Sequence, residues 1–133
     1  MMHPSNALSA EGSDFEKIYL SLREKEGRLY TDDIVRTLPQ LARSHPLSKE
    51  WRIRAHSAKR LLRHLEKKKP KSVVEVGCGN GWLTHLVASH LSVPCWGIDI
   101  NRTEISQAQR VFGEFQNISF IHPVVCYKKT PQY

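Results

Sequence analysis

Two kinds of hydrophobic pattern divide the chain. Up to about residue 69 the apolar positions recur in steps of three and four, which is typical of amphipathic helices. The most regular helix is predicted over residues 48–68, because Pro70 disfavours helical backbone in the residue before it. A shorter helix is predicted over residues 15–26, with Gly27 as its stop, and another ends before Pro39. The apolar positions of the longest helix are Trp51, Ala55, Ala58, Leu62 and Leu65.

Beyond residue 70, short apolar runs alternate with helical patterns. The runs at residues 73–76, 93–100 and 118–121 predict strands, and they are separated by helical patterns at residues 82–91 and from Thr103 onward. Strands that alternate with helices form parallel sheets with right-handed crossovers. The pattern therefore predicts an α/β fold with about three parallel strands, covered by helices on both faces.

The first predicted strand runs into a glycine-rich turn, and the second ends in a single acid. Residues 73–81 read Val-Val-Glu-Val-Gly-Cys-Gly-Asn-Gly, and Asp99 follows Gly77 by 22 residues. Main-chain amides in such a turn, with the N-terminus of the next helix, can hold an anion or a carboxylate. A carboxylate at the end of the neighbouring strand can accept hydrogen bonds from the two hydroxyls of a ribose. These features predict a site for a nucleoside-containing cofactor; the alternative is a glycine turn that only joins a strand to a helix.

The spacing of the glycines narrows the choice of cofactor. Dinucleotide-binding folds use the spacing G-x-G-x-x-G, whereas the three glycines of residues 77–81 alternate strictly, and Glu75 precedes them. Together with Gly-Ile-Asp-Ile-Asn at residues 97–101, this resembles the first two motifs of class I S-adenosylmethionine-dependent methyltransferases. The resemblance covers residues 71–121. It implies a Rossmann-like sheet, S-adenosylmethionine as cofactor, and methyl transfer to an acceptor that the sequence does not identify.

The resemblance also implies which residues contact the cofactor. Asp99 would bind the ribose hydroxyls, and its alternative role is a solvated carboxylate at a strand end. Glu75 would orient the amino group of the cofactor, or else only complete hydrogen bonds around the turn. Ile100 and Asn101 would border the adenine. The predicted cofactor-binding residues are Glu75, Gly77, Cys78, Gly79, Gly81, Asp99, Ile100 and Asn101.

No catalytic residue and no metal site are predicted. Methyl transfer is a displacement at carbon in which the cofactor brings the electrophile, so the protein mainly aligns the reactants and excludes water. The histidines on the predicted helices are expected to be surface or boundary residues. The three cysteines are Cys78, Cys95 and Cys126, without a C-x-x-C pair. Their odd number suits a reducing, cytoplasmic environment.

The resemblance stops before the end of the chain. Class I methyltransferases continue to seven strands, whereas residues 122–129 read His-Pro-Val-Val-Cys-Tyr-Lys-Lys and the sequence ends at Tyr133. We expect a truncated domain, with a tail that fits a shifted reading frame. The strand at residues 73–76 would then have an unpaired edge, from which we expect homodimerisation or poor solubility. The alternative to an enzyme is a remnant that does not turn over.

Three segments are expected along the chain. Residues 1–14 are predicted to be a disordered tail, residues 15–47 a helical segment, and residues 48–133 a partial methyltransferase domain that binds the cofactor. The apolar runs are too short to span a membrane, and the N-terminus lacks the apolar segment of a secretory signal.

The net charge of +7 arises in one segment of the chain. Residues 48–71 carry ten basic and two acidic side chains, whereas the charges of the remaining residues nearly cancel. This segment either contacts the phosphates of RNA or another anionic acceptor, or is the solvated face of an amphipathic helix. The methyl acceptor is expected to be a small molecule rather than RNA, because no aromatic residues are interleaved with the basic ones. A basic interaction module that uses the fold only as a scaffold is a further alternative.

Overall fold

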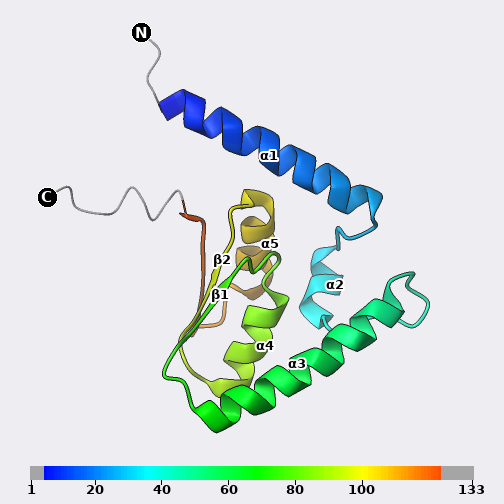
Figure 1. The fold of residues 1–133 in the computed structure, drawn as a ribbon, viewed down its shortest axis with the longest axis vertical. Coiled ribbons are helices and arrows are strands. Elements are labelled where there is room, and N and C mark those ends of the chain that lie inside the picture. Colours follow the sequence, from blue (N-terminus) through cyan, green and yellow to red (C-terminus); the bar gives the residue numbers. More distant parts are fainter. Residues whose placement is uncertain (1–4, 124–133) are drawn as a thin grey trace, which may run out of the picture. The chain divides into compact units, whose positions relative to one another are not determined.

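The computed structural model of the protein describes residues 5–123 (Figure 1). The chain divides into two compact units, Met1–Thr31 and Asp32–Tyr133. No helix in the described part of the chain is both long enough and apolar enough to cross a bilayer. The predictions for the segment after Pro123 lie outside the described residues.

The first unit contains helix α1, Ser5–Lys25. The predicted stop is confirmed: Gly27 adopts a φ of +68°, and the Arg28 N–H donates to the Arg23 carbonyl over 2.8 Å. The start is earlier than predicted, because the helix begins at Ser5 and so takes in residues that were expected to form a tail. The apolar period of residues 15–22 marks only part of the helix. Residues with high helix propensity, including Ala7, Leu8 and Ala10, continue it toward the N-terminus.

The second unit contains the alternating strands and helices that the sequence predicts. Its helices are α2 (Asp32–Thr37), α3 (Ser48–Lys68), α4 (Trp82–Leu91) and α5 (Arg102–Phe112). Its strands are β1 (Val73–Val76), β2 (Cys95–Ile98) and β3 (Ile118–Ile121). They form a parallel sheet in the order β1-β2-β3, which confirms the predicted Rossmann-like fold class.

One face of the sheet packs against helices. Cys95, Ile118 and Phe120 point to this face and are buried. Each crossover moves one strand further in the same direction, and crossovers of this kind are right-handed, so α4 and α5 lie on the same face. Figure 1 shows both helices on one side of the strands. The core of the unit therefore lies between the sheet and these helices.

Within residues 32–123 of this unit, the other face of the sheet has no helix against it. Val74 and Val76 on β1 are 54% and 83% exposed, and the register aligns Val76 with Ile98 and Ile121 on the same face. The prediction of a sheet covered on both faces is therefore wrong for residues 32–123. The apolar runs do not distinguish a strand covered on both faces from one covered on a single face. The outer edge of β1 pairs with no other strand in residues 32–123.

Two packing contacts attach the helices before β1 to the rest of the unit. Trp51 of α3 meets Trp82 of α4 edge to face, with ring centroids 5.1 Å apart. Asp32 of α2 accepts hydrogen bonds from Arg110 of α5, the shorter at 2.6 Å between Nε and Oδ2. The Arg110 guanidinium, with help from the Gln107 amide, lowers the pKa of Asp32 to about 2.

Candidate functional site

The turn between β1 and α4 has a backbone that favours glycine at alternate positions. Gly77, Gly79 and Gly81 have φ values of +75°, +55° and +83°. A side chain on Gly81 would also lack room, since a Cβ there would lie 2.6 Å from the Phe120 ring. The Cys78 N–H donates to the Ile98 carbonyl over 3.0 Å, which attaches the turn to the end of β2. The strict alternation of glycines therefore reflects both backbone conformation and close packing.

Asp99 lies directly against this turn. Its Oδ2 accepts a hydrogen bond from the Gly79 N–H over 2.8 Å, and its Oδ1 accepts one from the Asn101 N–H, also over 2.8 Å. The predicted proximity of the acid and the glycine turn is confirmed. Parallel pairing brings the carboxyl ends of β1 and β2 to the same edge of the sheet, which places two segments 20 residues apart in contact.

Glu75 lies on the helix-covered face of β1. Its Oε1 accepts a hydrogen bond of 2.8 Å from the Thr84 hydroxyl on α4. Burial raises the pKa of Glu75, the Thr84 hydrogen bond partly offsets this, and the nearby Asp99 charge raises it further. Of the two roles considered for Glu75 in the sequence analysis, the structure shows a local hydrogen bond beside the turn. The Thr84 backbone N–H also donates to this carboxylate, so both donors come from the first turn of α4.

Glu104 is a third acid beside the turn, and the sequence analysis did not single it out. It lies in the first turn of α5 and is only 4% exposed. Its Oε2 would be 3.8 Å from a Cβ built on Gly79. The Asn101 side chain caps this helix by accepting the Glu104 N–H over 3.1 Å. An Asn followed three residues later by a Glu is the spacing of a capping box, and this signal could have drawn attention to Glu104.

The charges around the turn are negative. Burial raises the pKa of the Cys78 thiol to about 12, helped by the charges of Asp99, Glu75 and Glu104 in that order. Cys78 is therefore a neutral thiol at physiological pH and not a nucleophile. A turn surrounded by carboxylates suits a cationic ligand and repels a pyrophosphate.

The two residues after Asp99 differ in exposure. Ile100 is 55% exposed, and its carbonyl accepts a hydrogen bond of 2.8 Å from Nε2 of His122. Asn101 is 3% exposed, and its Nδ2 is a buried donor without a recorded acceptor in the described residues. An unpaired buried donor costs about 1–3 kcal/mol, so this amide favours a ligand that brings an acceptor to it.

The aromatic and histidine side chains of α4 take part in packing. His85 stacks on Phe112 with ring centroids 4.4 Å apart, and burial lowers its pKa. His90 pairs with Glu66 of α3. Trp82, which could have lined the cofactor, has its ring against Trp51. These contacts give the histidines and the tryptophan structural roles.

A hollow of about 200 Å³ lies between α3, β1 and α4. It is lined mainly by aliphatic side chains, including Leu61, Leu65 and Val87, and it includes Glu75 and Thr84 but none of the glycines of the turn. No group of histidine, cysteine and acidic residues that could hold a metal ion is found within residues 5–123. The chemistry of the site therefore lies with the turn and its acids.

Comparison with known proteins supports the interpretation of the two motifs as those of a methyltransferase. A protein-family model described as a methyltransferase domain matches residues 49–128. A comparison with curated proteins found no match.

Two of the similar solved structures are of magnesium protoporphyrin IX methyltransferase from Synechocystis PCC 6803. The form with bound SAM is 18% identical, with a TM-score of 0.54, and the match covers 80% of this chain and 52% of that one. The form with bound SAH is 19% identical, with a TM-score of 0.50, and the match covers 68% of this chain and 44% of that one. The chain thus spans about half the length of these enzymes, and at this identity the likeness establishes the fold alone.

Proposed function

Because this chain belongs to the class I S-adenosylmethionine-dependent methyltransferase family, we propose that residues 77–81 and Asp99 bind S-adenosylmethionine for methyl transfer. The observation that carries the proposal is the hydrogen bond between the Gly79 N–H and the Asp99 carboxylate. It joins a bare main-chain turn to an acid at the adjacent strand end. S-adenosylmethionine needs both features, because it has an amino acid at one end and a ribose with adenine at the other.

The charge of the site favours this cofactor over a dinucleotide. S-adenosylmethionine carries a sulfonium cation, which the carboxylates of Glu75, Asp99 and Glu104 attract. The same carboxylates would repel the two negative charges of a pyrophosphate. The strict alternation of glycines and the acidic surroundings therefore support the same ligand.

We assign the predicted residues the following parts in binding. Asp99 accepts hydrogen bonds from the ribose hydroxyls, and the Glu75 carboxylate accepts one from the amino group of the methionine portion. Asn101 offers its buried Nδ2 to an acceptor on the adenine, and Ile100 covers the ring. The main chain of the turn lies against the methionine portion, through Gly77, Cys78, Gly79 and Gly81.

When bound, the cofactor supplies an electrophilic methyl group. The protein orients the sulfonium and excludes water, and it needs a general base only if the acceptor must lose a proton. We propose an unidentified acceptor, a small molecule in preference to RNA. We further propose a cytoplasmic setting, because Cys78 and Cys95 are buried free thiols. A remnant that binds cofactor without turnover is the second candidate, favoured by the sheet face that residues 32–123 leave uncovered.

Calorimetric titration tests the proposal. We expect S-adenosylhomocysteine to bind with saturable heat and a stoichiometry near one per chain, and NAD to give no saturable heat under the same conditions. NAD is the matched control because it also contains an adenosine. Saturable binding of NAD in place of S-adenosylhomocysteine would contradict the argument that the acids repel a pyrophosphate. Binding that is never followed by methyl transfer to any acceptor would favour the non-catalytic remnant.

We also propose that two copies associate through β1, the edge strand of the described sheet. The free edge and the adjoining apolar face of Val74 and Val76 offer main-chain partners and hydrophobic surface together. A lysine on an edge strand blocks such pairing, so Val76→Lys is expected to leave a monomer where the unchanged chain dimerises. Ile53→Lys is the matched control, because Ile53 is 64% exposed on α3. Sedimentation of the unchanged chain as a monomer at all loading concentrations would contradict the dimer.

A further inference from the structure

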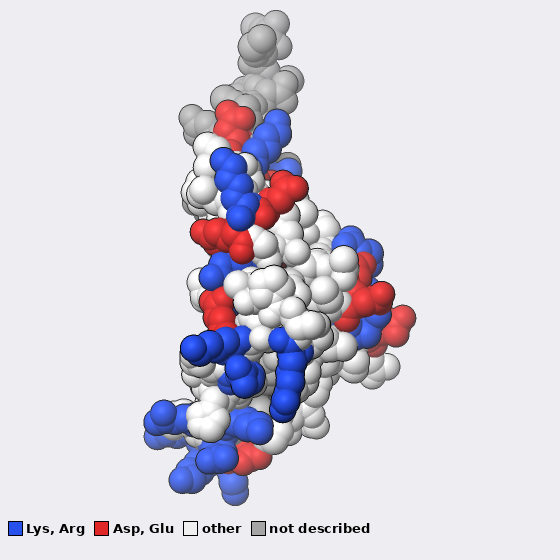
Figure 2. Space-filling view, turned by 90° about the vertical axis from the view of Figure 1, so that its right-hand side faces the viewer, with Lys and Arg blue, Asp and Glu red and all other residues white. Residues whose placement is uncertain are grey.

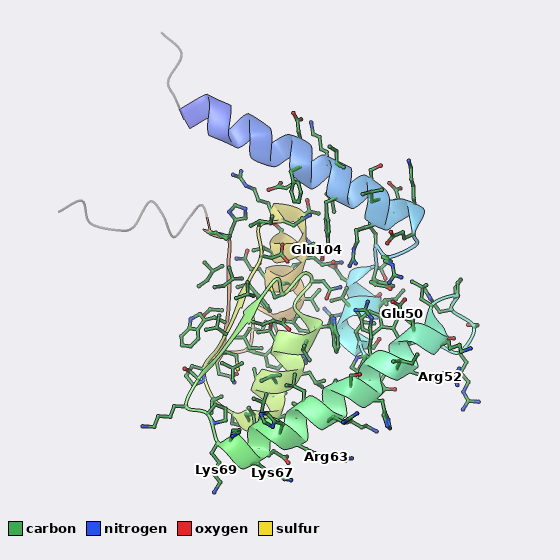
Figure 3. All side chains as sticks on the ribbon, viewed as in Figure 1. Glu50, Arg52, Arg63, Lys67, Lys69 and Glu104 are labelled. Carbon is green, nitrogen blue, oxygen red and sulfur yellow. The ribbon has the colours of Figure 1, made fainter. Side chains whose placement is uncertain are left out.

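The solvent-facing side of α3 carries a line of cationic side chains. Figure 2 shows Lys and Arg side chains gathered toward the bottom of the view, and Figure 3 labels several of them along α3. We call this line the basic stripe. Its members are exposed, and at about 100° per residue they fall within about 100° of one another around the helix, so they lie on one side of it. The basic stripe consists of Lys49, Arg52, Lys59, Arg60, Arg63 and Lys67.

The acids of α3 do not neutralise the basic stripe. Glu50 pairs with Arg54, 3.2 Å from Oε1 to Nη2, and Arg54 lies outside the stripe. Glu66 pairs with His90 of α4. Within the described part of the chain, no ion pair is recorded for any member of the stripe. The stripe thus presents its charges to solvent, where they are available to an anionic partner.

The apolar side of α3 is already occupied. Trp51, Ala58 and Leu62 are 3%, 4% and 8% exposed, so this side packs into the core. Ile53 and Leu61 are exposed, but they lie about two turns apart and form no continuous apolar surface. A helix that binds a bilayer surface needs a free apolar face to insert. The packing of α3 therefore favours a partner held by charge alone.

The C-terminal half of the basic stripe lies away from the proposed cofactor site, whereas its N-terminal half begins beside Trp51, which packs against Trp82 directly after the glycine turn. Its last member, Lys67, lies just before the start of β1 at Val73, whereas the glycine turn follows the end of β1 at Val76. In Figure 3 Arg63 and Lys67 lie at the opposite end of the unit from Glu104. The two surfaces also have opposite charge, since the turn is surrounded by carboxylates. A partner of the stripe would therefore bind beside the cofactor site and not in it.

We propose that the basic stripe binds the phosphate backbone of double-stranded RNA. From Lys49 to Lys67 the stripe extends about 27 Å at 1.5 Å per residue, so several successive phosphates of a duplex can lie along it. Trp51 is the one Phe, Tyr or Trp residue of α3, and it is 3% exposed, so this helix offers no such ring on which the bases of a single strand could stack.

The placement of α3 suits the shallow groove of an RNA duplex. One side of the helix is fixed in the core, so only the exposed side, which carries the basic stripe, can contact a duplex. A-form RNA has a wide, shallow minor groove bordered by phosphates, and a helix lying on a protein surface can contact it. Recognition by backbone contacts is independent of sequence. RNA binding by the basic stripe does not require the cofactor site, so a failure of either proposal leaves the other unaffected.

Fluorescence anisotropy with an RNA duplex of roughly 16 base pairs, the length that a double-stranded RNA-binding domain covers, tests this proposal. We expect binding at low salt with a steep salt dependence. The triple variant R52Q/R60Q/R63Q should bind about tenfold or more weakly, and its salt slope should fall by about 2–3, since each lost phosphate contact removes about 0.9. The variant R52K/R60K/R63K should retain binding, because it keeps the charges.

The control variant K17Q/K25Q/R36Q removes the same charge from exposed positions outside the stripe and should bind like the unchanged chain. Circular dichroism of all variants reports whether each one is folded. Equal weakening by the stripe and control variants would overturn the proposal, as would absence of binding at low salt. Tighter binding to a DNA duplex of the same length, or to vesicles of anionic phospholipid, would also overturn it and assign the stripe to that partner.

Discussion

Replacing Asp99 with alanine is expected to weaken S-adenosylhomocysteine binding by about 10- to 100-fold. The carboxylate lies at the turn, where its Oδ2 is 2.8 Å from the Gly79 N–H. Hydrogen bonds between a charged acceptor and ligand hydroxyls contribute about 1.5–3 kcal/mol, which corresponds to this range of affinity. Calorimetry at constant pH and salt measures the change.

Two further variants test whether the loss of affinity comes from removing the charge of Asp99 or from removing any acidic side chain of the protein. Asp99→Asn keeps the size of the side chain but removes its charge, so it should lose most of the affinity that the alanine variant loses. Asp33→Asn is the matched control, because Asp33 is exposed on α2 and pairs only loosely with Arg36, 3.4 Å away. Asp99 also supports the turn, so thermal unfolding of each variant is measured beside binding. Unchanged affinity in a folded Asp99→Ala protein would refute the assignment of the ribose to this residue.

Replacing Gly81 with alanine is expected to destabilise the second unit by about 2–5 kcal/mol. A φ of +83° costs a residue with a side chain about 1–2 kcal/mol. The new Cβ would also lie 2.6 Å from the Phe120 ring and 3.0 Å from the Ala108 Cβ. Overpacking of this kind costs about 1–3 kcal/mol more. Urea unfolding followed by circular dichroism measures the loss of free energy of unfolding.

Gly77→Ala provides the matched control for packing. Gly77 has a similar φ of +75°, but no atom lies within 4 Å of the position of its Cβ. This variant should therefore lose only the conformational cost, about 1–2 kcal/mol. Equal losses at the two positions would show that Phe120 does not pack closely against the turn. A larger loss at Gly77 would contradict the conformation of the turn itself.

Local patterns in the sequence were sufficient for the order of the elements and for the main pair of site features. The alternation of apolar runs and helical periods after residue 70 predicted the three strands in their correct positions. Each strand is partly buried, and this burial requires apolar residues within the strand itself. The glycine spacing predicted the turn, since the backbone conformation at Gly77, Gly79 and Gly81 is a local property. The position of Asp99 at the end of the next parallel strand was enough to bring it to the turn.

Other parts of the site depend on contacts between segments that the local pattern does not record. In the sequence Glu104 is not distinguishable from any other acid in the first turn of a helix. Only the packing of α5 brings it close to Gly79. Thr84 carries no signal that it donates to Glu75. Position 81 requires glycine for two reasons, its positive φ and the close approach of the Phe120 ring. The glycine spacing indicates the first reason, but the second involves a residue 39 positions away and is seen only in the structure.

The sequence by itself determined the order of strands and helices, the glycine turn and the acid beside it, because these follow from periods and spacings within single segments. Only the tertiary structure decided that one face of the sheet is covered in residues 32–123, since that depends on the direction in which successive crossovers move. It also decided that the acids gather at the turn while the bases of α3 face solvent. Both outcomes require three-dimensional packing, because they join residues that no local period relates.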